Sequence, residues 1–370
     1  GSSNTGVGCG ALFANTTGGQ NTALGMNSLD ANTTGASNTA VGFSALGANT
    51  TGGSNLAVGV CALPANTTGA GNVSIGCGTL LVNTTGTFNT ALGFRAMCSN
   101  TTVAGNTGLG ACALKKNTTG GGNTAVGYQS LQLNTTGANN TAMGCDALPT
   151  NTTGAGNTAI AHKALKSNTT GGDNVAVGLC SLESNTTGGS NTAVGGGSAD
   201  SVTTGDCTTF IGRVAGRNAT TGNNNIAIGY LSGTDSVRNI TSGSHNIVLG
   251  NADSATAHIK IDWTVTSDLR DKTEIKNVTH GLDFVNQITP IEYRFKKSRE
   301  DDTPHGLTKY GFKAQEILEL EGDNPVIINN EDEENLKLTS AHLIPVLVNA
   351  IKELKEKNDS LKTRIEALES

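Results

Sequence analysis

The 370-residue chain is poor in aromatic residues, in long apolar runs and, over its first two thirds, in charge. Aromatic residues make up 4% of the chain, which excludes a thick core filled by large side chains. No apolar run approaches the roughly 18 residues of a membrane-spanning helix, and no signal peptide is visible at Gly1. Residues 1–250 hold 8 of the 24 Lys and Arg residues and 7 of the 30 Asp and Glu residues. We therefore expect neither membrane insertion nor a basic face for nucleic acid.

A glycine recurs at every seventeenth position through most of the chain, and this period is the strongest pattern present. An Asn-Thr-Thr triplet repeats in step with it, from Asn15 to Asn185. A fixed period of this kind is typical of stacked repeat proteins, in which each repeat packs only against its neighbours. Ala161 fills the slot from which the glycine is missing. The glycines of the series are Gly8, Gly25, Gly42, Gly59, Gly76, Gly93, Gly110, Gly127, Gly144, Gly178, Gly195, Gly212 and Gly229.

The repeat unit, Asn-Thr-Thr-Gly-x-x-Asn-Thr-Ala-Val-Gly-x-x-Ala-Leu-x-x, predicts one coil of a β-solenoid. The unit is too short for a helix pair, and its two glycines disfavour helix. Asn-Thr-Ala-Val-Gly alternates polar and apolar residues and ends on a turn residue, which indicates a short strand. Ala-Leu is interpreted as a second strand or an arc, and Asn-Thr-Thr-Gly as a turn, because Asn and Gly tolerate left-handed backbone and Thr hydroxyls can bond nearby main chain. We expect the repeat glycines to stack in line.

The apolar slots of the repeat are small, mostly Ala, Val and Leu, so a single coil buries little surface. We therefore expect the solenoid to self-associate along its length. The pattern resembles the head repeats of trimeric autotransporter adhesins and the repeat regions of phage and viral tail fibres, although the coil expected here is longer than the adhesin head repeat. The resemblance implies that residues 1–250 form a trimeric, mainly β rod with threefold symmetry.

All eight cysteines lie in the repeat region, most of them in the two variable slots after the glycine. None belongs to a Cys-x-x-Cys pair, so we interpret them as small fillers and expect no metal site and no cofactor, with metal and disulfide readings as alternatives. Reduced thiols suit assembly in a host cytoplasm. The cysteines are Cys9, Cys61, Cys77, Cys98, Cys112, Cys145, Cys180 and Cys207.

The composition changes near residue 250, where charged residues become frequent, and this change predicts a domain boundary. Ala257–Thr266 alternates and is rich in β-branched residues, which predicts a strand within a connecting segment, 251–266. Residues 267–340 are interpreted as a small α+β domain. Its expected elements are a helix over Gly281–Ile288 stopped by Pro290, a strand over Ile291–Phe295, a helix that opens over Tyr310–Ile317, and an extended segment over Pro325–Ile328.

Residues 341–370 carry apolar side chains at alternating spacings of three and four, the a and d positions of a coiled coil. Asn358 is the polar a-position residue, a type that often specifies register. The heptads alone do not fix the number of strands. The apolar positions are Ile344, Leu347, Ile351, Leu354, Leu361, Ile365 and Leu368.

Residues 267–370 resemble the intramolecular chaperone domain of endosialidase tailspikes and other phage fibres. The motifs that carry this resemblance are Ser267-Asp268-x-Arg270-x-Lys272, Tyr293-x-Phe295, His305-Gly306, Gly311-Phe312-x-Ala314-Gln315-Glu316, Pro325-Val326 and the closing Leu-Ile-Pro-Val-Leu-Val-x-Ala-Ile-x-Glu-Leu run. Lys313 and Ser340 depart from the family pattern, which has an apolar residue and a Tyr there. In this family the domain guides trimerisation and then cuts itself off.

The resemblance implies that Ser267 is the nucleophile, that Lys272 is its base, and that the bond between Thr266 and Ser267 is cut. A serine hydroxyl is a weak nucleophile and needs a base beside it. A lysine serves as that base only when it is neutral, which requires desolvation or neighbouring cations. Burial that exists only in the assembled trimer would meet this requirement, so cleavage would report correct folding.

The same residues also have a purely structural interpretation. Ser267-Asp268 is a good N-cap for a short helix, and Lys272 would then be an ordinary exposed lysine. Asp268 and Arg270 are expected to shape the turn, and His305 is a candidate for assisting the chemistry.

The predicted function is a homotrimeric viral or phage fibre that attaches to a host receptor or glycan and resides in the virion. A cellular trimeric adhesin, or a structural surface fibre without self-cleavage, is the alternative, although residues 251–370 show no membrane anchor. The in-register Thr residues allow an ice-binding surface as a third reading. Glycosidase activity is not expected, because the acidic residues of the repeat region are scattered singly and glycosidases need two facing carboxylates.

Overall fold

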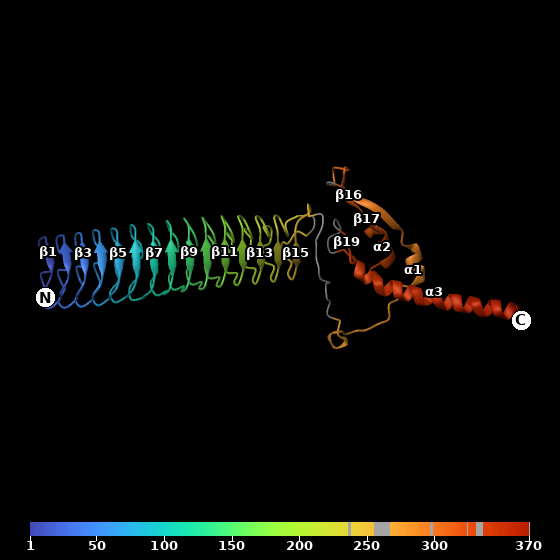
Figure 1. The fold of residues 1–370 in the computed structure, drawn as a ribbon, viewed down its shortest axis with the longest axis horizontal. Helices are drawn as coiled ribbons and strands as arrows, with labels where there is room; N and C mark the ends of the chain where they lie inside the picture. The colour runs from blue at the N-terminus through green and yellow to red at the C-terminus, as the bar shows by residue number, and fades with distance from the viewer. Residues whose placement is uncertain (236–237, 255–266, 297–298, 324, 331–335, 370) are drawn as a thin grey trace. The chain divides into compact units, whose positions relative to one another are not determined.

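The computed structural model describes residues 1–235, 238–254, 267–296, 299–323, 325–330 and 336–369 (Figure 1). The chain divides into two compact units, residues 1–254 and residues 255–370. Within the described ranges, no helix combines the length and the apolar character that crossing a membrane requires.

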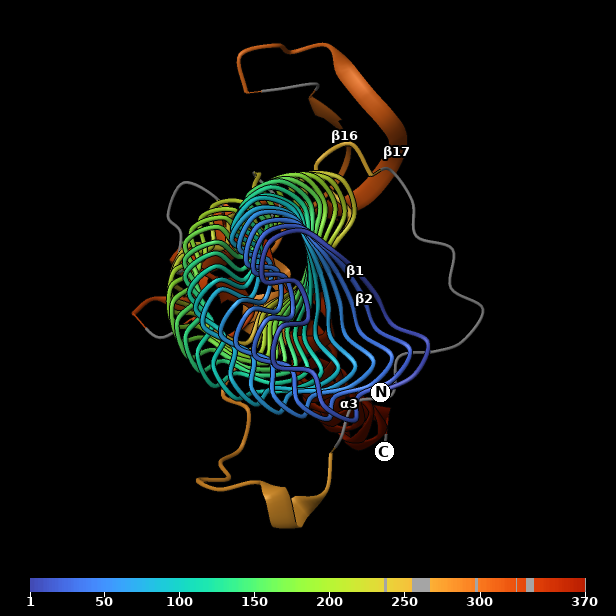
Figure 2. The same ribbon diagram turned by 90° about the vertical axis from the view of Figure 1, so that its left-hand side faces the viewer.

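The first unit is a β-solenoid in which each coil contributes one short strand to a single parallel sheet of fifteen strands. Neighbouring strands pair at an offset of one sequence period, as Thr39 does with Leu56, so the predicted coil length is confirmed. The last pair, Ile226 with Ile247, is offset by four positions more than the period. The coils nest on one another along the stack (Figure 2). The strands are β1 (Thr5–Val7), β2 (Thr22–Leu24), β3 (Thr39–Val41), β4 (Leu56–Val58), β5 (Val73–Ile75), β6 (Thr90–Leu92), β7 (Thr107–Leu109), β8 (Thr124–Val126), β9 (Thr141–Met143), β10 (Thr158–Ile160), β11 (Val175–Val177), β12 (Thr192–Val194), β13 (Thr209–Ile211), β14 (Ile226–Ile228) and β15 (Ile247–Leu249).

The repeat glycines stack in one column, as predicted, because the space beside each is filled by the backbone of the next coil. A Cβ atom on Gly25 would lie 2.5 Å from the carbonyl oxygen of Gly42. The φ angles of the series lie between 121° and 139°, a region that side chains disfavour. Ala161 occupies the column at φ 102°, so its coil carries backbone strain that glycine would avoid.

Two buried asparagine ladders join successive coils. In the first ladder, Asn49 Nδ2 donates to Asn32 Oδ1 in the preceding coil at 2.8 Å and to the carbonyl oxygen of Gly52 at 2.9 Å. In the second ladder, the backbone N–H of Asn38 donates to Asn21 Oδ1 at 2.9 Å. Most of these amides are buried and occupied by such bonds, so the Asn columns fasten coil to coil. The first ladder ends at Asn185, whose buried Oδ1 has no partner among the described residues, because Val202 fills the slot in the next coil.

The left-handed residues of each coil are not the Asn and Gly that tolerate this backbone most readily. The Asn and Gly of Asn-Thr-Thr-Gly do not have positive φ; the leucine of each Ala-Leu pair does, as Leu46 shows with φ 51°. The Ala-Leu segment is therefore an arc of turns and not a second strand. Left-handed backbone costs a leucine about 1–2 kcal/mol, whereas full burial of its side chain contributes about 1.5–3 kcal/mol. Burial of Leu46, which is 0% exposed, therefore outweighs the strain.

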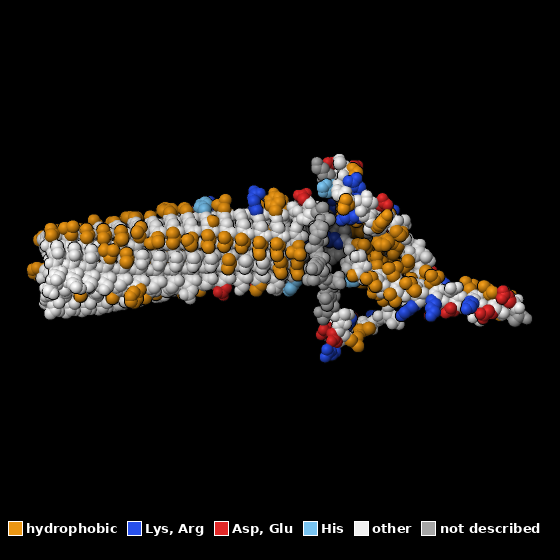
Figure 3. All heavy atoms as spheres, in the orientation of Figure 1, with side chains coloured by type: hydrophobic (Ala, Val, Ile, Leu, Met, Phe, Trp, Pro, Cys, Tyr) orange, Lys and Arg blue, Asp and Glu red, His pale blue; other side chains and the backbone are white. Residues whose placement is uncertain are grey.

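The solenoid core is narrow, and apolar side chains also line its outside. The strand-centre alanines and the Ala-Leu pairs fill the inside. Two outer columns, one immediately before and one immediately after each repeat glycine, are partly exposed; the first is apolar and the second mostly apolar, and we call them the glycine-flanking columns. Figure 3 shows apolar side chains in rows along the solenoid. Exposed members are Val7, Leu24, Leu92, Met143, Val194, Ile211, Ile228 and Leu249 before the glycine, and Met26, Phe43, Val60, Phe94, Tyr128, Leu179 and Tyr230 after it.

The second unit is a small α+β domain that ends in a long helix. Its described elements are the one-turn helix η1 (Leu269–Asp271), α1 (Leu282–Gln287), β16 (Pro290–Lys296), β17 (Pro304–Phe312), α2 (Ala314–Glu321), β18 (Ile328–Asn329), β19 (Lys337–Leu338) and α3 (Ser340–Glu369). β16 pairs antiparallel with β17, and β18 with β19. The predicted helices near 282, 314 and 341 and the strand near 291 are present. The helix expected from Tyr310 begins only at Ala314, because Tyr310–Phe312 pair with Pro290–Glu292 in the sheet. The predicted strand Ala257–Thr266 lies outside the described residues.

A compact apolar core joins α1, α2, β18 and the first turns of α3. Phe284, Ile317, Ile328, Leu343 and Val346 meet in it. Further along α3, the apolar heptad residues have no such cover and are 52–87% exposed. These residues are Ile351, Leu354, Leu361, Ile365 and Leu368, so α3 presents an apolar row toward solvent in the single chain.

Candidate functional site

A single helical turn brings Ser267 and Lys272 together. Asp268 is the N-cap of η1, and its Oδ1 accepts a hydrogen bond from the backbone N–H of Arg270 at 2.9 Å. This bond satisfies one of the N–H groups that a helix start leaves without a partner. At the other end, the N–H of Lys272 donates to the carbonyl oxygen of Leu269 at 3.2 Å. The turn is short, so its two flanking side chains face each other.

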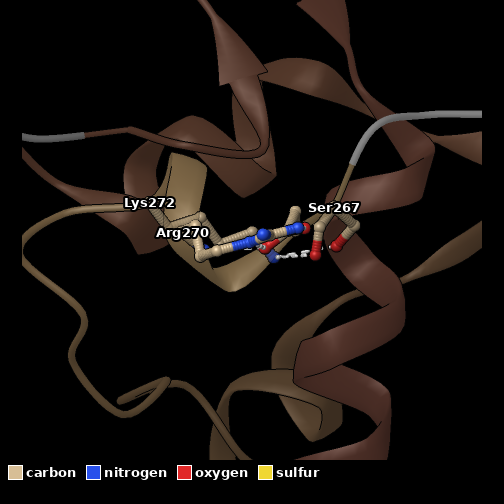
Figure 4. Close-up of polar contacts among 4 residues, drawn as sticks. Ser267, Arg270 and Lys272 are labelled. Atoms are coloured by element: carbon tan, nitrogen blue, oxygen red, sulfur yellow. Dashed lines mark hydrogen bonds and ion pairs between the residues drawn. The ribbon is translucent and has the colours of Figure 1, made fainter.

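Lys272 Nζ donates to Ser267 Oγ at 2.8 Å and to the carbonyl oxygen of Ser267 at 3.2 Å (Figure 4). A hydroxyl at hydrogen-bond distance from an amine is the arrangement that activated serine nucleophiles use. Both side chains are exposed in the single chain. Water around an amine favours the charged form, which cannot accept the serine proton. The geometry of a nucleophile and base is therefore present, while the desolvation that the base needs must come from groups packed over the turn.

Asp268 and Arg270 hold the shape of this turn through a second set of bonds. Arg270 Nη2 lies 2.6 Å from Asp268 Oδ2, and Nε lies 3.1 and 3.2 Å from the two carboxylate oxygens. Hydrogen bonds from the Arg270 side chain and then from its backbone N–H keep the pKa of Asp268 below its usual range. The same carboxylate raises the pKa of the guanidinium. Because the Arg270 side chain is 88% exposed, this pair contributes little to stability and acts mainly on geometry.

The other residues predicted for the site lie elsewhere or outside the described residues. His305 is an exposed residue of β17, opposite Phe295, and within the described residues no hydrogen bond joins it to Ser267 or Lys272. Asn358 lies exposed on α3. Thr266, on the acyl side of the predicted cleavage bond, is outside the described residues.

A second group of chemically reactive side chains lies in the solenoid and was missed by the sequence analysis. Cys145, Asp146 and His162 bring a thiol, a carboxylate and an imidazole within 4.8 Å of one another. The signal that could have found them is the period itself, because Cys145 and His162 stand one period apart and therefore occupy the same slot of adjacent coils.

Comparison with known protein families places the Ser267–Lys272 turn inside a recognised domain. Residues 267–324 match the family model described as chaperone of endosialidase, so the match begins at Ser267 and includes Lys272. No curated protein and no solved structure matches the chain significantly. The chain therefore carries, behind a parallel β-solenoid, a C-terminal domain of the endosialidase-chaperone family.

Proposed function

We propose that this chain is a homotrimeric fibre protein of a phage or virus, whose C-terminal domain directs assembly and then releases itself by cleavage between Thr266 and Ser267. The solenoid stays behind as the shaft, carried in the virion, and binds a host receptor or glycan. The observation that carries the proposal is the 2.8 Å hydrogen bond between Lys272 Nζ and Ser267 Oγ inside the family match.

The chemistry follows from a nucleophile that sits next to its own scissile bond. Neutral Lys272 removes the hydroxyl proton of Ser267, and Oγ attacks the carbonyl carbon of Thr266 through a five-membered ring. The carbon–nitrogen bond breaks, Lys272 returns the proton to the departing Ser267 nitrogen, and an ester links Thr266 to Oγ. Water then hydrolyses the ester to a Thr266 carboxylate and the restored Ser267 hydroxyl. Atoms balance with one water consumed, and no cofactor is needed.

Two surfaces of the single chain support self-association. The first surface is apolar and ordered: the glycine-flanking columns repeat along the solenoid. The heptad row of α3 is exposed as well. Identical chains in register would cover both surfaces, since a repeat of one coil in one chain matches the same repeat in its neighbour.

Trimer assembly also supplies the condition that the turn lacks. Ser267 and Lys272 are exposed in the single chain, so the lysine is hydrated. A neighbouring copy packed over the turn would remove this water and favour the neutral amine. Cleavage would then follow assembly, because the base becomes competent only in the finished oligomer.

The cleavage is tested on the full chain with the variants Ser267→Ala and Lys272→Ala, followed by denaturing gel, native mass and N-terminal sequencing. We expect the unmodified chain to yield a 1–266 shaft and a fragment that begins at Ser267, and both variants to trimerise without cleavage. Lys276→Ala is the matched control, since Lys276 is an exposed lysine of the same segment and should leave the rate unchanged. Cleavage of Lys272→Ala at the normal rate would show that the turn is only a capped helix start.

Assembly is tested at the distal part of α3. Deleting the whole helix would also remove Leu343 and Val346 from the domain core, so a double substitution, Leu361→Lys with Ile365→Lys, is the cleaner change. We expect it to shift the native mass from trimer to monomer or aggregate and to slow cleavage. Lys362→Ala, on a polar position of the same stretch, is the control. A trimer of normal yield from the double variant would contradict the assembly role of this row.

A further inference from the structure

Cys145, Asp146 and His162 form a group without parallel among the described coils of the solenoid. Their potential ligand atoms all lie within 4.8 Å of one another. Cys145 follows Gly144, and His162 follows Ala161, so both lie in the glycine-flanking column that comes after the glycine. The adjacent coils carry Tyr128 and Leu179 in this column. Two neighbouring coils therefore carry a thiol and an imidazole at a position where most coils carry an apolar side chain.

The backbone that carries these side chains is fixed by the coil-to-coil ladder. The N–H of Asp146 donates to the carbonyl oxygen of Tyr128 at 3.0 Å, and the carbonyl oxygen of Cys145 accepts from the N–H of Lys163 at 3.2 Å. The carbonyl oxygen of His162 accepts from the N–H of Cys180 at 3.1 Å. The three side chains therefore project from a rigid surface, and only their own torsions must adjust to close around a ligand.

We propose that Cys145, Asp146 and His162 bind a transition-metal ion, with Zn²⁺ as the favoured occupant. Thiolate, imidazole and carboxylate are ligands that Zn²⁺ takes in a tetrahedral arrangement, with water as the fourth ligand of an exposed site. Bond lengths of about 2.0–2.3 Å place tetrahedral ligand atoms about 3.4–3.7 Å apart. The present separations, up to 4.8 Å, close to that value by rotation of exposed side chains. The donor set also speaks against Mg²⁺ and Ca²⁺, which prefer oxygen ligands throughout.

Asp146 and a Cys145 thiolate would favour a divalent cation at this site, and the nearby Lys163 opposes it. The Cys145 thiol donates to Asp146 Oδ2 at 3.7 Å. Zn²⁺ displaces the thiol proton, so binding releases one proton and leaves thiolate and carboxylate to neutralise the ion. The positive charge of Lys163 lies near the thiol and repels the metal. Cys180, in the next coil, is not a member of this group.

The test is a titration of the full-length Ser267→Ala chain, kept uncleaved, with Co²⁺ under reducing conditions, followed by competition with Zn²⁺. Co²⁺ bound to a thiolate gives a sulfur-to-metal charge-transfer absorption, which identifies the ligand directly. We expect one ion per chain, displaced by Zn²⁺. Cys145→Ser should abolish the absorption, and His162→Leu should weaken affinity at least about tenfold. Leucine fits the slot, since Leu179 fills it in the next coil.

Two further variants make the result specific. Asp146 has φ 51°, a backbone region that Asn tolerates, so Asp146→Asn removes the charged ligand without disturbing the coil and should also weaken binding. Cys77→Ser is the matched control, because Cys77 is an exposed cysteine in the same slot of another coil. Absorption that survives Cys145→Ser, disappears in Cys77→Ser or saturates at one ion per three chains would overturn the proposed site. Absence of any charge-transfer absorption would overturn it equally.

Discussion

Replacement of one ladder asparagine by aspartate tests the main stabilising device of the solenoid without changing side-chain volume. Asn134 is 0% exposed. Its Nδ2 donates to Asn117 Oδ1 at 2.8 Å and to the carbonyl oxygen of Gly137 at 2.8 Å, and its Oδ1 accepts from Asn151 Nδ2 at 2.7 Å. In Asn134→Asp an oxygen replaces the donating nitrogen, so Asn117 Oδ1 loses its donor. The carbonyl oxygen of Gly137 loses one of two donors and keeps Asn123 Nδ2 at 2.9 Å.

The magnitude follows from Asn117 Oδ1, the acceptor left without a donor. A buried group left without a partner costs about 1–3 kcal/mol, so the local free energy of unfolding should fall by about that amount at neutral pH. Burial and the neighbouring oxygens also raise the pKa of the new carboxyl. The native state then binds a proton more tightly than the unfolded state does, so the destabilisation should shrink as the pH falls through the raised pKa. A protonated carboxyl restores one donor.

Hydrogen exchange read by mass spectrometry gives the local effect, because coils of a repeat protein open separately. Peptides that cover residues 117–151 should exchange at least about fivefold faster at neutral pH, which corresponds to about 1 kcal/mol. Asn139→Asp is the control, since Asn139 is exposed at φ 58° and Asp173 holds the same slot at φ 57°. Equal exchange in the two variants would refute the argument that buried ladder bonds hold the coils together.

Three further changes probe other parts of the chain. Ala161→Gly should relieve backbone at φ 102° and stabilise its coils by about 1 kcal/mol, measured as slower local exchange. Arg270→Gln should return the pKa of Asp268 toward its ordinary value, which NMR titration measures. In the unmodified chain the charged Asp268 supports the turn at pH values above its ordinary pKa, and this support is lost as the pH falls through the lowered pKa of the folded state. Glu321→Gln should lower the melting temperature of the second unit, because the Glu321 carboxylate accepts the backbone N–H groups of residues 326–328 at 2.7–3.0 Å and a buried N–H left unpaired costs about 1–3 kcal/mol.

The repeat length and the glycine column could be predicted from the sequence because both depend on backbone alone. A position that tolerates no Cβ shows itself as a recurring glycine, and its spacing equals the coil length. The left-handed leucines could not be predicted in the same way. Leu46 at φ 51° contradicts single-residue preference, and only the burial that the finished coil provides explains it. The prediction of a helix from Tyr310 was wrong for a related reason. Tyr310–Phe312 pair with the distant strand segment Pro290–Glu292, and this pairing overrides the local helical pattern.

The two candidate sites also differ in how far the sequence alone predicts them. Contact between Ser267 and Lys272 depends on one local turn, whose capping residue Asp268 is evident in the sequence. In the trimer that we propose, the environment of that pair depends on neighbouring chains and cannot be derived from local pattern. The contact between Cys145 and His162 depends on the register of the coils, so it becomes predictable only once the sequence period is taken as a distance in space.

The similarity of the contacts between coils affects how the length of the solenoid can change during evolution. Most internal coils offer their neighbours the same glycine contact, the same two amide ladders and the same strand register, and from Asn15 to Asn185 the one exception in the glycine column is Ala161. A recombination event that deletes or duplicates the codons of one repeat therefore joins surfaces that already fit, and the rod becomes shorter or longer by one step of about 4.8 Å. The length of the solenoid is therefore a heritable property that can change in small steps, one repeat at a time, while the C-terminal domain stays the same.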